Sequence, residues 1–265
     1  MLKIQDVTKY FNLNTVDQKL ALSQVSIDLN EGDFMTVIGS NGAGKSTLLN
    51  IIAGVHSVDQ GAVLLDGKNI LVLPEYRRAL YISRIFQDPM KGTAPNMTVE
   101  ENLSMAMARG KKRGLRKGIS RGNREMFKES LAQLELGLED RLNDKVGLLS
   151  GGQRQAITLL MSTITSPKLL LLDEHTAALD PKTGSKIVEL TEKIVSDNNL
   201  TTMMVTHNME QALSLGNRLI MLHGGKVILD LKDDQKKRMT VDGLLYEFER
   251  SRGEKFVDDR VILAN

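Results

Sequence analysis

The segment from Gly39 to Ser46 has the residue types and spacing of a phosphate-binding loop: a glycine, four residues, and then Gly-Lys-Ser. An apolar run, 34–38, precedes it and a helical pattern begins at Lys45, so the segment is expected to join a buried strand to a helix. Glycines let successive N–H groups converge on one anion, and the helix N-terminus adds a favourable partial charge. Lys45 can reach the β and γ phosphates, and the Ser46 hydroxyl can ligate Mg²⁺. The residues predicted to bind phosphate, hereafter the phosphate loop, are Gly39, Ser40, Asn41, Gly42, Ala43, Gly44, Lys45, Ser46 and Thr47.

Two carboxylates end a second apolar run, 169–172. Neighbouring residues on a strand point to opposite faces, so Asp173 and Glu174 are expected to have distinct roles. Asp173 is predicted to hold Mg²⁺ through water, and Glu174 to orient and polarise an attacking water. Alone, the pair is equally compatible with a strand that ends in polar turn residues, but the phosphate loop in the same chain favours the chemical interpretation.

A phosphate loop by itself is compatible with kinases, GTPases and ATPases. The chain has no Asn-Lys-x-Asp segment of the kind that reads guanine, which weighs against a GTPase. It also offers no identifiable acceptor site for a phosphotransferase acting on a small substrate.

The elements expected around these residues alternate between strands and helices. Half-exposed antiparallel strands are predicted from the alternation in 2–7 and 25–29, and a hairpin turn at Asp66-Gly67. A helix is predicted over 45–53, ended by Gly54, and another from Pro181 with Asp180 as its cap. Since buried-strand signals at 169–172 and 202–205 flank the second helix, a parallel sheet is expected.

The stretch between about Pro89 and Leu149 is predicted to be a mostly helical insertion. Thr98, with Glu101 three residues later, indicates a helix start. Apolar residues recur at helical spacing at Met126, Phe127, Leu131 and Leu134. The tail is charged and carries one amphipathic patch, Leu244, Leu245, Tyr246 and Phe248.

The composition is that of a globular protein without disulfides. The chain has 265 residues, of which 41% are apolar, and a net charge of +2, which argues against a nucleic-acid partner. It has no cysteine, which excludes disulfides and thiolate metal sites. The N-terminus does not read as a secretory signal, and no apolar run approaches the ~18 residues that a spanning helix needs.

Ser150-Gly151-Gly152-Gln153, upstream of the acidic strand, completes a set of motifs that resembles the ABC transporter ATPase family. The resemblance covers roughly residues 2–230, and the order of the motifs is highly specific. The other matching features are Tyr10-Phe11 near the start, Gln87 after Phe86, the Asp173-Glu174 pair, Ala178-Leu179-Asp180, and His207 after Thr206.

The resemblance implies an α/β fold. Its core is a P-loop NTPase (RecA-like) core with a parallel sheet, an N-terminal antiparallel β subdomain and an inserted helical subdomain. The cassette is expected over residues 1–230, with the helical insertion at about 88–149, and residues 231–265 are expected to form a charged C-terminal tail.

The resemblance also implies roles for single residues. Phe11 is similar to the aromatic that stacks on adenine, although Tyr10 is one position away and remains an alternative. Asp180 resembles a residue that crosses to a partner's site. Catalytic roles are implied for Glu174, His207 and Gln87, and metal-binding roles for Ser46, Gln87 and Asp173.

A head-to-tail dimer is implied as well, with ATP held between the phosphate loop of one copy and a second segment of the other. A serine hydroxyl and glycine N–H groups at a helix N-terminus make a second anion site. The residues of that segment, hereafter the signature segment, are Ser150, Gly151, Gly152 and Gln153.

Two features depart from the family pattern or are not explained by it. His175 stands where the family often has proline; it could bond near the γ-phosphate, but replacement of a turn residue is the favoured interpretation. From Arg109 to Arg124 the chain has eight basic residues and no acid, interleaved with glycines. This stretch is expected to be a flexible loop, either solvated or in contact with anionic lipid headgroups or acidic permease loops.

A single cassette without fused spanning helices resembles the separate-subunit bacterial importers. The resemblance implies a permease and a substrate-binding lipoprotein as partners, a location at the cytoplasmic face of the membrane, and an amino acid or similar small solute as cargo. The alternative is a non-transport member of the superfamily that acts as a mechanical or binding module. Twin-cassette proteins need two phosphate loops and chromosome-maintenance ATPases need a long heptad segment, and this sequence has neither.

Overall fold

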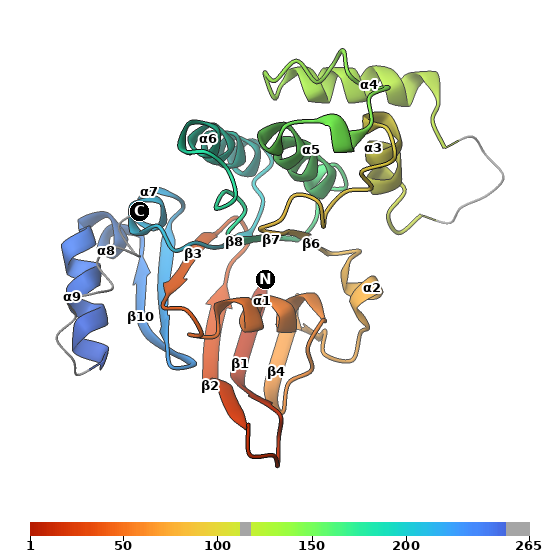
Figure 1. The fold of residues 1–265 in the computed structure, drawn as a ribbon. Helices are drawn as coiled ribbons and strands as arrows, with labels where there is room; N and C mark the ends of the chain where they lie inside the picture. The colour runs from red at the N-terminus through yellow and green to blue at the C-terminus, as the bar shows by residue number, and fades with distance from the viewer. Residues whose placement is uncertain (112–117, 253–265) are drawn as a thin grey trace. The chain divides into compact units, whose positions relative to one another are not determined.

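The structure is a computed structural model that describes residues 1–111 and 118–252. The chain forms two compact units (Figure 1). The first unit comprises residues 1–79 and 200–265, and the second unit comprises residues 80–199.

The N-terminal part of the first unit is an antiparallel sheet with strand order β2-β1-β4-β5. Its alternating side chains are buried on one face, and Ile4 pairs with Ile27 in the register of β1 and β2. The predicted hairpin is confirmed, because Asp66 and Gly67 both have positive φ, as a tight hairpin turn requires. The strands are β1 (Leu2–Phe11), β2 (Lys19–Leu29), β4 (Gln60–Leu65) and β5 (Lys68–Asn69).

The first unit also contains the strands that carry the phosphate loop. In β3 (Phe34–Gly39) every residue is buried, as expected of a strand covered on both faces. It pairs in parallel with β8 (Thr202–Val205) and β9 (Arg218–His223), which confirms the predicted parallel sheet, and β10 (Lys226–Lys232) adds an antiparallel edge. The helices before residue 80 are α1 (Lys45–Ala53), ended by Gly54 as predicted, and α2 (Glu75–Arg78).

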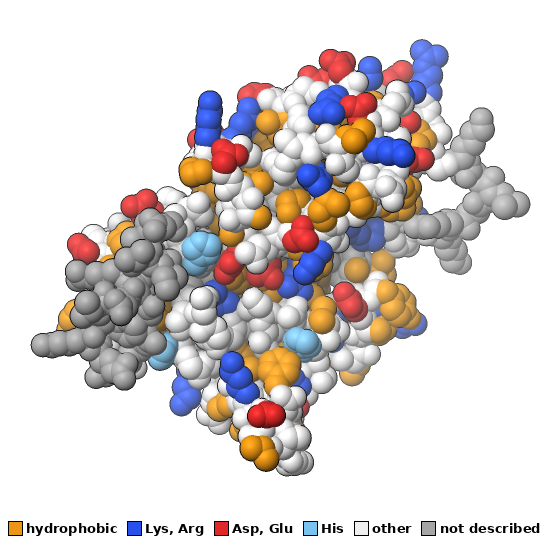
Figure 2. Space-filling model, in the orientation of Figure 1, with side chains coloured by type: hydrophobic (Ala, Val, Ile, Leu, Met, Phe, Trp, Pro, Cys, Tyr) orange, Lys and Arg blue, Asp and Glu red, His pale blue; other side chains and the backbone are white. Residues whose placement is uncertain are grey.

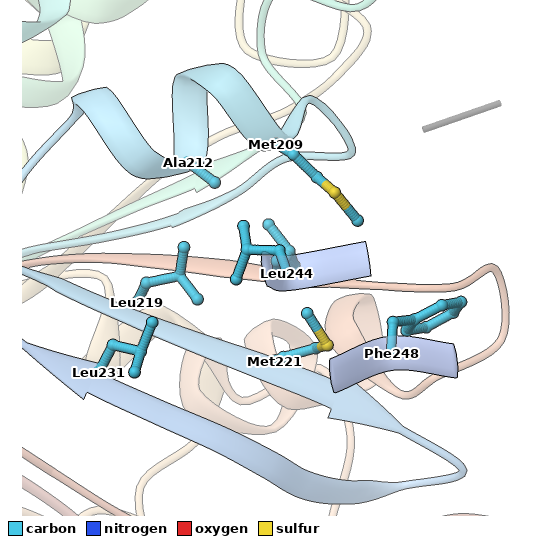
Figure 3. Close-up of a cluster of buried hydrophobic side chains, with 8 residues drawn as sticks. Met209, Ala212, Leu219, Met221, Leu231, Leu244 and Phe248 are labelled. Carbon is cyan, nitrogen blue, oxygen red and sulfur yellow. The ribbon is translucent and has the colours of Figure 1, made fainter. Parts of the chain in front are cut away.

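The end of the described chain packs on this sheet. The expected tail boundary at residue 230 falls inside β10, and α7 (Met209–Ser214), α8 (Asp233–Arg238) and α9 (Val241–Arg252) belong to the first unit. Figure 3 shows Leu244 and Phe248 pointing from α9 into a buried cluster. Tyr246, from the same amphipathic patch, is 63% exposed. The cluster consists of Ile38, Met209, Ala212, Leu219, Met221, Leu231, Leu244 and Phe248.

The second unit combines two parallel strands with helices. β6 (Ile82–Ile85) pairs with β7 (Leu169–Asp173), and α5 (Gly151–Thr163) and α6 (Pro181–Asp197) lie side by side over them (Figure 1). Its other helices are α3 (Val99–Met107), α4 (Arg121–Ala132) and the short 3-10 helix η1 (Val146–Leu148).

The helical patterns in this unit are largely confirmed. Thr98 caps α3 in a capping box with Glu101, and Phe127 and Leu131 are buried on α4. Met126 is 37% exposed, because at the helical period it lies about 100° from the buried Phe127.

Acidic and basic side chains are intermingled over the face drawn in Figure 2, in keeping with the small net charge of +2. Within residues 1–111 and 118–252, no helix combines the length and the apolar character needed to cross a membrane.

Candidate functional site

The phosphate loop connects β3 to α1, and its backbone geometry requires glycine at two positions. Gly39 has φ +149°, and a Cβ there would lie 2.1 Å from the carbonyl oxygen of Leu222. Gly44 has φ +104°, and its Cβ would lie 2.6 Å from the carbonyl oxygen of Ala21. Since Gly44 is the N-cap of α1 and no side chain caps this helix, the N–H groups of its first turn are directed at whatever occupies the loop.

Lys45 lies across this loop. Its Nζ donates to the carbonyl oxygens of Gly39, at 2.7 Å, and of Ser40, at 3.2 Å, and the residue is 6% exposed. Asn41 and Ser46 are exposed. The predicted residues therefore lie around one loop. The Lys45 ammonium is bonded to the backbone of this loop, and Ser46 is exposed in the first turn of the helix that follows.

The N-terminal aromatic is linked to the loop through Lys19. Phe11 pairs with Lys19 in the register of β1 and β2, and Lys19 Nζ is 3.9 Å from the Cβ position of Gly42. The half-buried Phe11 ring meets the ring of His56 edge to face, with centroids 5.2 Å apart. Tyr10 precedes Phe11 on the strand and points to the opposite face, so the two candidates for an adenine contact have different surroundings.

His207 lies at the sheet edge where the phosphate loop begins. Val37 pairs with Val205 in parallel, and the N–H of Thr206 donates to the carbonyl of Val37 at 3.1 Å. Continuing this register by two residues sets His207 level with Gly39, since both strands run the same way. The first unit therefore gathers the phosphate loop, Phe11 and His207 from adjoining elements.

The acidic pair ends β7 in the second unit, but the strand does not continue through both residues. Asp173 is the last strand residue, whereas Glu174 has φ +46° and begins a turn in which its carbonyl accepts the N–H of Ala177. The expectation that strand alternation separates the two carboxylates was therefore wrong. A left-handed backbone at Glu174 separates them instead, at a conformational cost that the surrounding packing must offset.

Arg84 contacts the carboxylate of Asp173. Its guanidinium donates to Asp173 Oδ2 at 2.6 Å, and the two side chains are 13% and 15% exposed. The sequence motifs do not include this residue. The available signal was an arginine inside the mainly apolar segment 82–86, because a charge in such a place needs a partner. Gln87 follows β6 and is exposed.

His175 is 1% exposed and bonds to α6. Its Nε2 lies 3.0 Å from Thr191 Oγ1, and that hydroxyl donates to the carbonyl of Ile187 at 2.7 Å. The hydroxyl must then accept from Nε2–H, which leaves Nδ1 as the unprotonated nitrogen. Burial lowers the pKa of His175 to about 4, so the ring is neutral near pH 7. This contact supports the interpretation of His175 as a turn and packing residue.

The signature segment begins α5. Ser150 Oγ accepts the N–H of Gln153 and Gln153 Oε1 accepts the N–H of Ser150, both at 3.2 Å, which is a capping box. Gln153 Oε1 also accepts from Arg141 at 3.1 Å, and its Nε2 donates to the carbonyl of Leu136 at 3.2 Å. The Gln153 side chain therefore fixes the helix start, while Ser150 remains exposed.

The starts of α5 and α6 are in close contact. A Cβ at Gly152 would lie 2.2 Å from the methyl of Thr183, and one at Gly151 would lie 3.2 Å from Leu179. Asp180 is exposed and caps α6 by accepting the N–H of Thr183 at 3.1 Å. Its pKa is lowered, mainly by the side-chain hydrogen bond from Thr183. The second unit therefore brings the signature segment and Asp180 together.

The basic stretch does not behave as one loop. Arg109 is half-buried and donates to Ser83 Oγ at 2.7 Å, and burial lowers its pKa. Arg121 and Arg124 belong to α4 and pair with Glu125 and Glu100, so the expected loop was wrong at this end. Lys112, Arg113, Arg116 and Lys117 lie outside the described residues.

Comparison with known proteins gives matches over most of the chain. The profile of the ABC transporter family matches residues 22–177. A tyrosine transport ATP-binding protein from Clostridioides difficile (strain R20291) is 49% identical over 94% of this chain and 99% of the relative. A xylose/arabinose import ATP-binding protein from Sulfolobus acidocaldarius is 34% identical over 89% of each chain. A dimeric ATP-binding cassette, solved in a post-hydrolysis state with ADP and Pi, has a TM-score of 0.74 at 33% identity, covering 88% of this chain and 98% of that chain.

Proposed function

The chain belongs to the ABC transporter family, and on that premise we propose that this ATPase energises a membrane importer of amino acids or similarly small solutes. The observation that carries the proposal is the geometry of the phosphate loop. Its glycines, its uncapped helix start and Lys45 form a cradle for the phosphates of ATP.

We assign the nucleotide contacts of one subunit to the first unit. The phosphate loop binds the phosphates. When ATP binds, the Lys45 ammonium leaves the carbonyl oxygens of the loop and contacts the β and γ phosphates. Phe11 stacks on adenine; its half-buried ring beside Lys19 and His56 supports this choice over Tyr10. His207, at the same sheet edge as Gly39, contacts the γ-phosphate.

Mg²⁺ fits the donors that these residues offer. Among residues 1–111 and 118–252 no group of three or more His, Cys, Asp or Glu side chains could hold a metal ion. A protein cage is not required, because Mg²⁺ in nucleotide sites keeps several waters and takes its remaining ligands from one or two side chains and the phosphates. Ser46, Gln87 and Asp173 would hold it, and it would neutralise phosphate charge.

Hydrolysis is assigned to Glu174, Gln87 and His207. Glu174 polarises the attacking water, and its position in a turn just beyond Asp173 supports a role separate from metal binding. Gln87 and His207 orient the water and the γ-phosphate. These roles require no group outside the chain other than Mg-ATP and water.

A second copy of the chain completes each site in this proposal. The signature segment begins a helix with Ser150 exposed, which suits it to bind the γ-phosphate of ATP held by a partner subunit. Asp180, next to that segment, crosses toward the partner's site. ATP then holds the dimer closed, and hydrolysis loosens it.

The remaining partners are those of a transporter subunit. We propose that permease subunits hold the dimer at the cytoplasmic face of the membrane and that a substrate-binding protein delivers the cargo. The Clostridioides difficile relative is named for tyrosine transport, which supports an amino acid as cargo. The cassette itself does not contact the cargo, so co-purification of the permease is the route to its identity.

Glu174→Gln is the test of this function. The variant should bind ATP with unchanged affinity, lose most of its turnover, about 10²-fold or more, and accumulate as a dimer in light scattering with saturating Mg-ATP. Lys45→Ala is the control for binding, because it should weaken nucleotide affinity and give no ATP-dependent dimer. Normal turnover in the glutamine variant, or a monomer at saturating ATP, would overturn the proposal.

A further inference from the structure

Arg84 and Asp173 lie on the same face of the β6–β7 pair. Arg84 is opposite Leu171 in the parallel register, and Asp173 is two residues beyond Leu171, so both side chains project to one side of the strands. The guanidinium also lies over the ring of Phe86, 4.8 Å from its centroid. Strand register, the aromatic ring and the 2.6 Å ion pair together hold the guanidinium against the carboxylate.

The contact uses only one oxygen of the carboxylate. Arg84 donates to Oδ2, and Asp173 Oδ1 accepts no hydrogen bond within the described part of the chain. An arginine remains protonated at any pH at which proteins are studied. Asp173 is therefore paired with a permanent positive charge on one side and keeps a second oxygen open for another positive group.

We propose that Arg84 is a resident counter-cation that reduces the dependence of nucleotide binding on Mg²⁺, an inference that rests on the function proposed above. Without the metal, Arg84 balances the charge of the carboxylate that, in the proposed function, shares Mg²⁺ with ATP. With the metal, the guanidinium opposes the approach of a second cation to the same carboxylate. Both effects narrow the difference in nucleotide affinity with and without Mg²⁺.

The signs of the two effects follow from charge alone. Removing the positive charge leaves Asp173 as an unpaired, mostly buried anion, so nucleotide should bind more weakly without metal. The same change removes a repulsion on Mg²⁺, so binding with metal should be unchanged or tighter. A residue that only supported the fold would weaken both affinities by the same factor and leave their ratio unaltered.

The test measures the dissociation constant of a non-hydrolysable ATP analogue in EDTA and in saturating Mg²⁺. In Arg84→Met the ratio of the two constants should rise by about 10-fold over that of the wild type, which is on the order of one solvent-screened charge interaction. Arg84→Lys keeps the charge and should restore a ratio close to that of the wild type. If Arg84→Met does not fold, Arg84→Gln supplies a neutral donor to Asp173 and should give the same rise.

The outcomes separate this inference from the proposed function. A wild-type protein that does not bind the analogue under either condition contradicts the proposed function. A wild-type protein that binds it in a Mg²⁺-dependent way, with an unchanged ratio in the folded neutral variants, overturns the role of Arg84. Failure of Arg84→Lys to restore the ratio also overturns it, because the charge would not be the property that matters.

Discussion

Glu174 and His175, which directly follow β7, differ in what the fold requires of them: an unusual backbone conformation at Glu174 and a buried side chain at His175. Glu174 is held with a left-handed backbone, which costs on the order of 1 kcal/mol or more for a residue with a side chain. His175 is completely buried and bonded to Thr191. The burial of the His175 side chain provides packing that holds the left-handed turn at Glu174 in place. It also makes this turn sensitive to protonation of His175.

The histidine gives a prediction about pH. Its folded-state pKa of about 4 lies below the ordinary value of about 6.5, so as pH falls the unfolded chain takes up a proton that the folded chain does not. His175 should therefore contribute fully to stability above about pH 6.5, and this contribution should fall by about 3 kcal/mol by pH 4. Urea unfolding of the wild type and His175→Asn between pH 7.5 and 4 measures it: the difference in free energy of unfolding should shrink on acidification, and parallel curves would contradict the prediction.

At the scale of elements, the described helix starts of the second unit depend on local capping chemistry. Thr98 with Glu101, and Ser150 with Gln153, form reciprocal capping boxes, and Asp180 caps α6 before Pro181. The contact between the starts of α5 and α6 depends instead on the missing side chain of Gly152.

Gly152→Ala should lower the free energy of unfolding by about 1–3 kcal/mol, because the new methyl overlaps that of Thr183. Gly122→Ala is the control: Gly122 lies in α4 with open space at its Cβ position, and alanine there should stabilise by up to about 1 kcal/mol. Chemical denaturation compares the two, and equal effects would show that the close approach at Gly152 is not rigid.

In α9, the sequence pattern predicts an apolar patch, but packing decides which of its residues are buried. Leu244 and Phe248 are one helical turn apart and are buried, while Tyr246 between them faces outward. The apolar patch predicted from the sequence is therefore a packed edge of the first unit on one side and a solvated surface on the other.

At the scale of the whole molecule, the proposed dimer can be tested by complementation. Each site would combine the phosphate loop of one copy with the signature segment of the other, so Lys45→Ala and Ser150→Phe subunits would each be inactive on their own. Mixed dimers would contain one site with both parts intact, and an equal mixture should recover roughly a quarter of wild-type ATPase activity.

The control for complementation is the double variant Lys45→Ala/Ser150→Phe mixed with either single variant. Every site in those mixtures contains at least one defective part, so their activity should remain at background. Recovery only in the mixture of the two single variants supports sites shared between copies. No recovery in that mixture would indicate that each chain completes its own site.

Features that depend on adjacent residues could be predicted from the amino-acid sequence. The phosphate loop between β3 and α1, the cap at Thr98, the Asp180-Pro181 helix start and the hairpin at Asp66-Gly67 were all predicted with their correct elements. Each is specified by backbone conformations and hydrogen bonds within a few residues, so its chemistry can be recognised without knowledge of the fold. Motif order was similarly sufficient for the family.

Features that depend on distant segments became visible only in the folded chain. Arg84 and Asp173 are 89 residues apart and meet through the register of β6 and β7. Phe11 is linked to Gly42 only through Lys19 on β2, and His175 is buried because α6 folds back over its turn. Strand register and burial are set by the packing of the whole unit, since the same local sequence can end exposed or enclosed.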